Sequence, residues 1–328
     1  MIRRSVVAAA VVLLLLALAS LAWVEGRRAP MRAEALLRWI DARRGRVPHT
    51  AVVVTTTFAG GRAITTTARL LCTGDRRSRI EYLTPPLKGV VAIQHGGRIH
   101  REGGPTPGLL MASATPCEET PSLHQRRFEL LLRNYEARDL GSARAAGRPA
   151  RRLLLIHRHT HHVARRWWVD PDTGLILRTD DFRADGTVGV RTVYREVKLL
   201  PPHRAERVQA SIPYAPEVPP PLAEAELLRY LGLPGIRPRY VPVGYEYEAF
   251  SHTRCGCPCG EPVAHIQYSD GLRALSVFAS RHLPAEAEPV AVMLPVGDML
   301  RLRHRGVAFA FLGEVGLPEL HRMARSLP

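Results

Sequence analysis

Residues 147–186 constrain the fold of this chain more than any other stretch. The apolar runs 153–156 and 167–169 flank a polar tip rich in His and Arg, and residues 170–174 then read Asp-Pro-Asp-Thr-Gly. Aspartate first, proline second and glycine last suit a tight turn, because proline presets φ and glycine tolerates a positive φ. Asp-Gly at 185–186 marks a further hairpin turn. The stretch is therefore predicted to form an antiparallel meander of consecutive strands.

Similar patterns continue on the N-terminal side of this meander. Runs rich in Val, Thr and Ile at residues 50–58 and 63–71 are joined by a Gly-Gly turn, which predicts a hairpin. Apolar residues at helical spacing predict amphipathic helices over 31–44 and 123–134. Residues 30–200 are thus expected to form an antiparallel sheet of roughly ten strands with two helices, and sheets this wide tend to curl.

The N-terminus has the pattern of an export signal. Arg3 and Arg4 precede an uncharged run over residues 5–24, and Ala-Leu-Ala at 17–19 offers a cleavage site. The run also approaches the ~20 residues needed to span a bilayer. Residues 1–24 are therefore predicted to be either a cleaved signal peptide or a single-span anchor. The rest of the chain is expected to be extracytoplasmic and close to the membrane.

A proline-rich segment over residues 200–222 is expected to divide the chain. Proline at this density is not expected to sustain a helix or an interior strand, and it favours an extended, semi-rigid spacer. A second, smaller α+β domain is predicted over 222–328, with several strands and a terminal helix at 317–326. With such a spacer the two domains are expected to fold separately and to sit at a variable angle.

The order of these pieces resembles one protein family. AGRPA at 146–150, an apolar strand, WWVDPDTGLILR at 167–178 and a strand ending in Asp-Gly are similar to the N-terminal domain of the MucB/RseB family of sigma-E regulatory proteins. YSDGLRALSVF at 268–278 resembles the C-terminal domain of the same family. The resemblance implies an α+β fold. Its first domain would be an antiparallel half-barrel, as in the LolA/LolB lipoprotein carriers, with helices on the concave side, and a smaller C-terminal α+β domain would follow.

The same resemblance implies a non-enzymatic regulator of envelope-stress signalling. Such proteins bind the outer portion of a membrane-spanning anti-sigma factor, shield it from proteolysis and release it when lipid or lipoprotein ligands bind. An apolar cavity within residues 30–200 would then hold the ligand, with Trp39, Phe128 and Leu131 as candidate lining residues. The alternative is a lipoprotein or lipid carrier that uses the same cavity without a signalling partner.

The histidines at the polar tip of the meander are one candidate metal site. His157, His159 and His161 alternate along the chain, and an H-x-H pair on one face of a strand is a known zinc-ligand arrangement. They also fall at the expected hairpin tip, where strand alternation breaks down. A solvated polar tip is therefore the competing interpretation.

The cysteines are the second candidate metal site. Cys255, Cys257 and Cys259 lie within five residues, with glycine and proline between them. Export favours a disulfide among these closely spaced cysteines. The alternative is a zinc site with His252 or His265 as a further ligand. A metal- or thiol-dependent activity at residues 255–259 is a separate functional hypothesis. No other cofactor is predicted.

The charge of the chain limits the classes of partner that it is expected to bind. The net charge is +16, and only Lys88 and Lys198 are lysines. No arginine run exceeds two residues, and no basic stripe of the kind that nucleic-acid binding requires is visible. An exported basic surface is expected to meet anionic lipid head groups or an acidic partner. The sequence also shows no nucleophile triad, phosphate loop or paired carboxylates, so no enzymatic activity is predicted.

Overall fold

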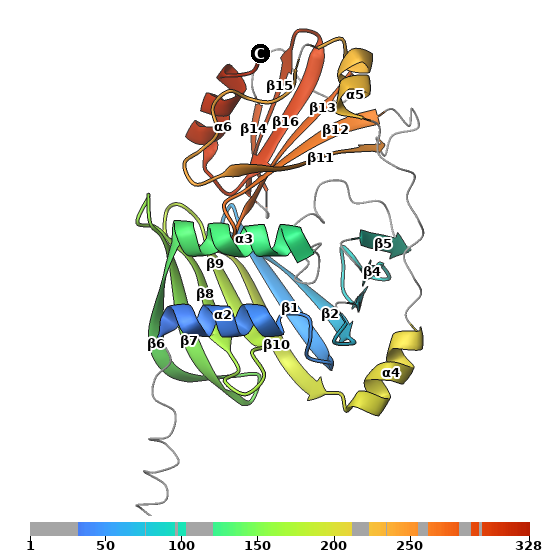
Figure 1. Ribbon diagram of the computed structural model, residues 1–328, viewed down its shortest axis with the longest axis vertical. Helices are drawn as coiled ribbons and strands as arrows, with labels where there is room; N and C mark the ends of the chain where they lie inside the picture. Colours follow the sequence, from blue (N-terminus) through green and yellow to red (C-terminus); the bar gives the residue numbers. More distant parts are fainter. Residues whose placement is uncertain are drawn as a thin grey trace, which may run out of the picture.

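The fold consists of two antiparallel sheets, one in each half of the chain (Figure 1). The computed structural model describes residues 32–75, 77–95, 98–102, 121–211, 223–233, 235–254, 262–281, 290–294 and 297–328. Within these ranges the first sheet has ten strands and the second has six. The predicted α+β architecture, with a large N-terminal sheet and a smaller C-terminal one, is confirmed. The predicted signal peptide or anchor at 1–24 lies outside the described residues.

The N-terminal sheet consists of two series of neighbouring strands that meet at its centre. Its order is β5-β4-β3-β2-β1-β10-β9-β8-β7-β6, so the predicted meander over β6 to β10 is confirmed. The strands are β1 (His49–Ala59), β2 (Arg62–Cys72), β3 (Ser78–Tyr82), β4 (Val91–His95), β5 (Arg98–Glu102), β6 (Tyr135–Ala145), β7 (Arg148–His157), β8 (Val163–Val169), β9 (Ile176–Phe182) and β10 (Val188–Leu199). Antiparallel pairing of β1 with β10 joins the two series.

The turn between β8 and β9 forms as its sequence predicts. Asp170 Oδ1 accepts hydrogen bonds from Asp172 N at 2.9 Å and Thr173 N at 3.3 Å, and its backbone oxygen accepts one from Gly174 N at 2.9 Å. Gly174 has a φ of +78°, which glycine adopts without strain. Arg148 Nε donates to Asp170 Oδ2 at 2.5 Å. The buried carboxylate is therefore satisfied, and it fixes the turn against the neighbouring strand.

Two helices lie on the same face of the N-terminal sheet, α2 (Ala33–Arg43) and α3 (Pro121–Asn134) (Figure 1). Their apolar sides and the facing strand residues form what we call the N-terminal core. Its buried members are Leu36, Leu37, Ile40, Leu131, Tyr135, Leu153, Leu155, Ala164, Trp167 and Val169. Burying one large apolar side chain stabilises a fold by about 1.5–3 kcal/mol, so this core holds both helices on the sheet.

The C-terminal sheet has the strand order β11-β12-β13-β16-β15-β14. The elements are α5 (Glu224–Leu231), β11 (Glu246–Arg254), β12 (Pro262–Ser269), β13 (Ala274–Ser280), β14 (Val290–Leu294), β15 (Gly297–His304), β16 (Val307–Gly313) and α6 (Leu317–Arg325). Every residue of the central strand β16 is buried. Leu227 and Leu231 of α5 and Leu320 and Met323 of α6 pack against the sheet in a separate core.

A helix, α4 (Pro202–Ser211), occupies the first half of the predicted spacer. The prediction that proline density prevents a helix here is wrong for these residues. Pro201 and Pro202 stand at the start of the helix, where a missing N–H costs nothing, and residues 203–211 contain no proline. The backbone oxygen of Pro201 accepts from Arg204 N at 2.9 Å and Ala205 N at 3.0 Å. Residues 212–222 lie outside the described ranges.

Within the described ranges, no helix combines the length and the apolar character that crossing a bilayer needs.

Candidate functional site at the domain junction

The C-terminal domain meets α3 through the turn between β12 and β13. We call residues 269–273 the docking turn. Gly271 has a φ of +94°, and a Cβ built there would lie 2.1 Å from Leu131 N and 2.5 Å from Arg127 O. The backbone of the turn therefore lies directly on the backbone of α3, where only glycine fits both the space and the dihedral.

The side chain of Asp270 organises the docking turn and ties it to β6. Asp270 Oδ1 accepts from Leu272 N at 2.9 Å and Arg273 N at 2.7 Å, as in an Asx turn. Its other oxygen accepts a hydrogen bond from the hydroxyl of Tyr135, the first residue of β6. Burial, together with the Asp270 carboxylate, raises the pKa of Tyr135 well above its ordinary value. The hydroxyl thus remains a hydrogen-bond donor to Asp270.

The C-terminal end of α3 is also held by the C-terminal domain. Asn134 is 1% exposed, and its Nδ2 donates to Gly244 O at 2.7 Å and Asp270 O at 3.0 Å. One amide group therefore satisfies two carbonyls of the other domain. Leu272 of the docking turn packs against the N-terminal core. The contact is consequently both polar and apolar.

Arg273 extends from the docking turn to the N-terminal sheet. Its guanidinium donates to Phe182 O at 2.5 Å and to Ala164 O at 3.4 Å. Its Nε lies 2.9 Å from Glu314 Oε2, an acid of its own domain. Burial raises the pKa of Glu314, and Arg273 partly offsets this effect. Arg273 thereby links carbonyls of β8 and β9 to the C-terminal domain.

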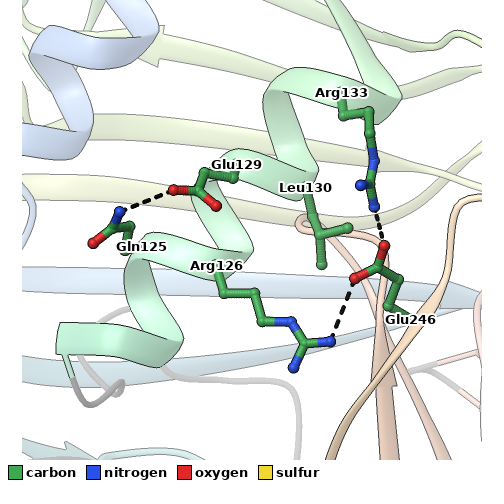
Figure 2. A pocket seen from close by; sticks show the side chains of 6 residues that line it. All are labelled: Gln125, Arg126, Glu129, Leu130, Arg133 and Glu246. Atoms are coloured by element: carbon green, nitrogen blue, oxygen red, sulfur yellow. Dashed lines mark hydrogen bonds and ion pairs between the residues drawn. The ribbon is translucent and has the colours of Figure 1, made fainter.

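Ion pairs between α3 and β11 form a second layer around this contact. Arg127 donates two hydrogen bonds to Glu248, whose side chain is 3% exposed. On the solvent side, Glu246 pairs with Arg126 at 3.3 Å and with Arg133. Hydrogen bonds from Arg133 are the main cause that lowers the pKa of Glu246. These exposed pairs, which we call the rim (Arg126, Arg133 and Glu246), border a shallow depression together with Gln125, Glu129 and Leu130 (Figure 2).

The candidate histidines separate at the end of β7. His157 is buried beside the junction: its ring centroid lies 5.1 Å from that of Tyr135, and burial lowers its pKa. His159 and His161 are exposed in the tip that follows. Within the described ranges, no group of three or more His, Cys, Asp or Glu side chains is arranged to hold a metal. Cys255, Cys257 and Cys259 lie outside those ranges. Zinc binding by the histidines or by the cysteines stays a prediction.

The three candidate ligand-lining residues all belong to the layer between the helices and the sheet. Leu131 is buried in the N-terminal core, and Trp39 and Phe128 pack against it partly buried. A lipid-holding role for them stays a prediction. Their placement shows that α3 faces two partners, because the same helix turn that carries Leu131 also carries the backbone that Gly271 contacts.

Comparison with known proteins identifies the N-terminal part of the chain. The family described as MucB/RseB N-terminal domain matches residues 63–212. The matched residues contain most of the N-terminal sheet, so this domain is similar to the MucB/RseB N-terminal domain. Among curated proteins no sequence gives a match.

Solved structures of MucB share the fold of both domains. The complex structure of Pseudomonas aeruginosa MucA/MucB has 21% identity and a TM-score of 0.66, covering 90% of this chain and 98% of that chain. A crystal structure of MucB in complex with MucA(peri) has 22% identity and a TM-score of 0.60, with 90% and 98% coverage. The crystal structure of MucB alone has 22% identity and a TM-score of 0.60, covering 90% of this chain and 97% of that chain. The two-domain fold of this chain is therefore the MucB fold.

Proposed function

We propose that this protein binds the outer portion of a membrane-spanning anti-sigma factor and thereby controls sigma-E-type envelope-stress signalling. The observation that carries the proposal is the two-domain fold, which extends over 90% of the chain and matches MucB in complex with MucA(peri). The junction adds support, because it fixes both domains in one arrangement and lets a partner contact both at once. Such a bound partner is shielded from proteolysis.

Release by a lipid or lipoprotein ligand has a physical route through α3. One side of this helix carries Phe128 and Leu131 into the N-terminal core, while its backbone near Arg127 supports Gly271 of the docking turn. An acyl chain that enters between α3 and the sheet moves the helix, and this displaces the docking turn. The ligand can shift the equilibrium only by its differential affinity for the docked and undocked arrangements.

Calorimetric titration tests this function. The full chain is titrated with the extracytoplasmic segment of the anti-sigma factor that is encoded beside a sigma factor in the same genome. Saturable binding that weakens when a fatty acid or a lipoprotein acyl chain is added is the expected result. Binding of acyl chains without any binding of the segment supports the lipid-carrier alternative and contradicts the regulatory function.

A further inference from the structure

The face of the N-terminal sheet opposite α2 and α3, which we call the outer face, is rich in arginine. Trp167 points into the N-terminal core, so its neighbour Trp168 belongs to the outer face. The strand register then aligns two rows across β6 to β10. One row contains Arg138, Leu154, Arg166, Asp180 and Arg191, and the other contains Arg152, Trp168 and Arg178.

Two carboxylates pair with three of these five arginines. Asp180 is 1% exposed and accepts from Arg178 Nε at 3.0 Å and Arg191 Nε at 2.8 Å. The guanidinium of Arg138 donates to Glu136 at 2.7 Å. Because Asp180 carries one charge and is shared between two arginines, even this part of the face keeps a positive excess.

Arg152 and Arg166 are not neutralised within the described part of the chain. Arg152 donates to a backbone oxygen, that of Leu140, at 2.8 Å. The guanidinium of Arg166 lies 5.8 Å from the ring centroid of Trp168 and 5.3 Å from that of Phe182. The Nε atoms of both arginines are buried without an acceptor. Residues at diagonal positions on adjacent strands lie about 7–8 Å apart, so two uncompensated charges stand side by side.

The shape and composition of the outer face distinguish between two kinds of anionic partner. Four spacings between β6 and β10 span about 20 Å, which is wider than a strand-sized groove for one peptide. Apolar side chains alternate with the arginines, and Leu140 is 36% exposed. Trp168 is 7% exposed and has the guanidinium of Arg178 4.1 Å from its ring centroid. Broad basic surfaces with interspersed apolar groups suit an anionic bilayer.

We propose that the outer face around Arg152 and Arg166 docks on an anionic phospholipid bilayer. Charge complementarity carries the proposal: an arginine close to an anionic leaflet favours the bound state by about fivefold, the equivalent of about 1 kcal/mol. The inference does not depend on partner binding. Docking leaves the opposite face, with α2, α3 and the junction, directed away from the lipid.

Arginine footprinting of the full chain tests the proposal. The chain is mixed with vesicles of phosphatidylcholine alone or with added phosphatidylglycerol, treated with phenylglyoxal and digested for mass spectrometry. Any hydrophobic N-terminal anchor inserts into both kinds of vesicle, so their difference reports the outer face. Modification of Arg152 and Arg166 is expected to fall about fivefold or more on the anionic vesicles and to recover at high salt. Arg305, exposed in the C-terminal domain, is the internal control and stays unchanged.

A variant provides the second readout. In the double variant Arg152→Gln/Arg166→Gln, the affinity for anionic vesicles is expected to fall by about 30-fold, so that the protection of Arg138 is lost, whereas Arg305→Gln leaves this protection unchanged. Equal modification of Arg152 and Arg166 on both kinds of vesicle overturns the proposal. Protection by soluble polyglutamate but not by vesicles also overturns it, because the face then recognises an acidic polypeptide.

Discussion

The inner and outer parts of the contact between α3 and the C-terminal domain use similar polar groups but differ in burial. Asp270 and Asn134 are each 1% exposed, whereas the rim residues Glu246 and Arg133 are 40% and 60% exposed at their side chains. A buried polar group costs free energy unless it is paired, so the inner contacts define one arrangement. Exposed ion pairs contribute little and exchange partners readily. The inner part therefore holds the two domains together, whereas the exposed rim residues can exchange their ion pairs for contacts with another molecule.

The largest expected effect is at Gly271. The variant Gly271→Val puts a side chain against the α3 backbone, and we expect it to lose about 4 kcal/mol or more of unfolding free energy. Urea denaturation followed by tryptophan fluorescence measures the loss. Gly186→Ala is the matched control, since Gly186 also has a positive φ, of +83°, but has nothing within 4 Å of a built Cβ. It is expected to lose only about 1 kcal/mol. Equal losses contradict the role of the docking turn.

The next effect is at the buried ion pair between the domains. Arg127→Met leaves the carboxylate of Glu248 buried without its charge partner, and we expect a loss of about 2–3 kcal/mol. Arg133→Met removes an arginine from the same helix at the rim and is expected to cost less than about 1 kcal/mol. Denaturation curves of the two variants give the comparison. If Arg133→Met costs as much as Arg127→Met, burial is not what separates the two layers.

A smaller effect is expected at Tyr135. Tyr135→Phe removes the donor to Asp270 and keeps the ring packed, so the expected loss is about 1–2 kcal/mol. Tyr240→Phe is the comparison, because Tyr240 donates to Glu319 within the C-terminal domain and is less buried. Its expected loss is below about 1 kcal/mol. A double-mutant cycle between Tyr135 and Asp270 measures the coupling, and a coupling near zero argues against this hydrogen bond.

The smallest effect is at the rim and depends on pH. The pKa of Glu246 in the folded protein is lowered from 4.5, mainly by Arg133. A carboxyl group with a depressed pKa stabilises the fold fully above its ordinary pKa, and this stabilisation is lost as pH falls through the lowered value. Glu246→Gln is therefore expected to cost under about 0.5 kcal/mol at pH 7 and nothing at pH 2, with the difference reduced by salt. A cost that persists at pH 2 means that the side chain acts through packing.

The sequence predicted what local chemistry determines. The turn at residues 170–174 and the meander around it follow from aspartate, proline and glycine at positions where each has one strong preference. The helix α4 was missed because proline count was weighed without regard to position, although Pro201 and Pro202 both stand at a helix start. The expectation of a variable angle between the domains was based on the spacer alone. It left out the interface that the described residues form between the domains.

The junction could not be predicted from local patterns, because its residues look ordinary along the chain. Asp270 and Gly271 read as a common hairpin turn, and Tyr135 reads as the first residue of a strand. Their roles come from contacts with residues more than 130 positions apart, such as the hydrogen bond from Tyr135 to Asp270. The one available signal was the resemblance of residues 268–278 to a family pattern, which marked the turn but not its partner.

Hydrogen exchange of the full chain tests the central claim, that the docking turn holds the C-terminal domain on α3. In the unmodified protein we expect slow exchange at the amides of residues 127–134 and 269–273, as a buried interface requires. In Gly271→Val both segments are expected to exchange at least about tenfold faster, while β16 keeps its protection and shows that the C-terminal domain is folded. Fast exchange of α3 in the unmodified protein, or unchanged protection of α3 in the variant, contradicts the claim.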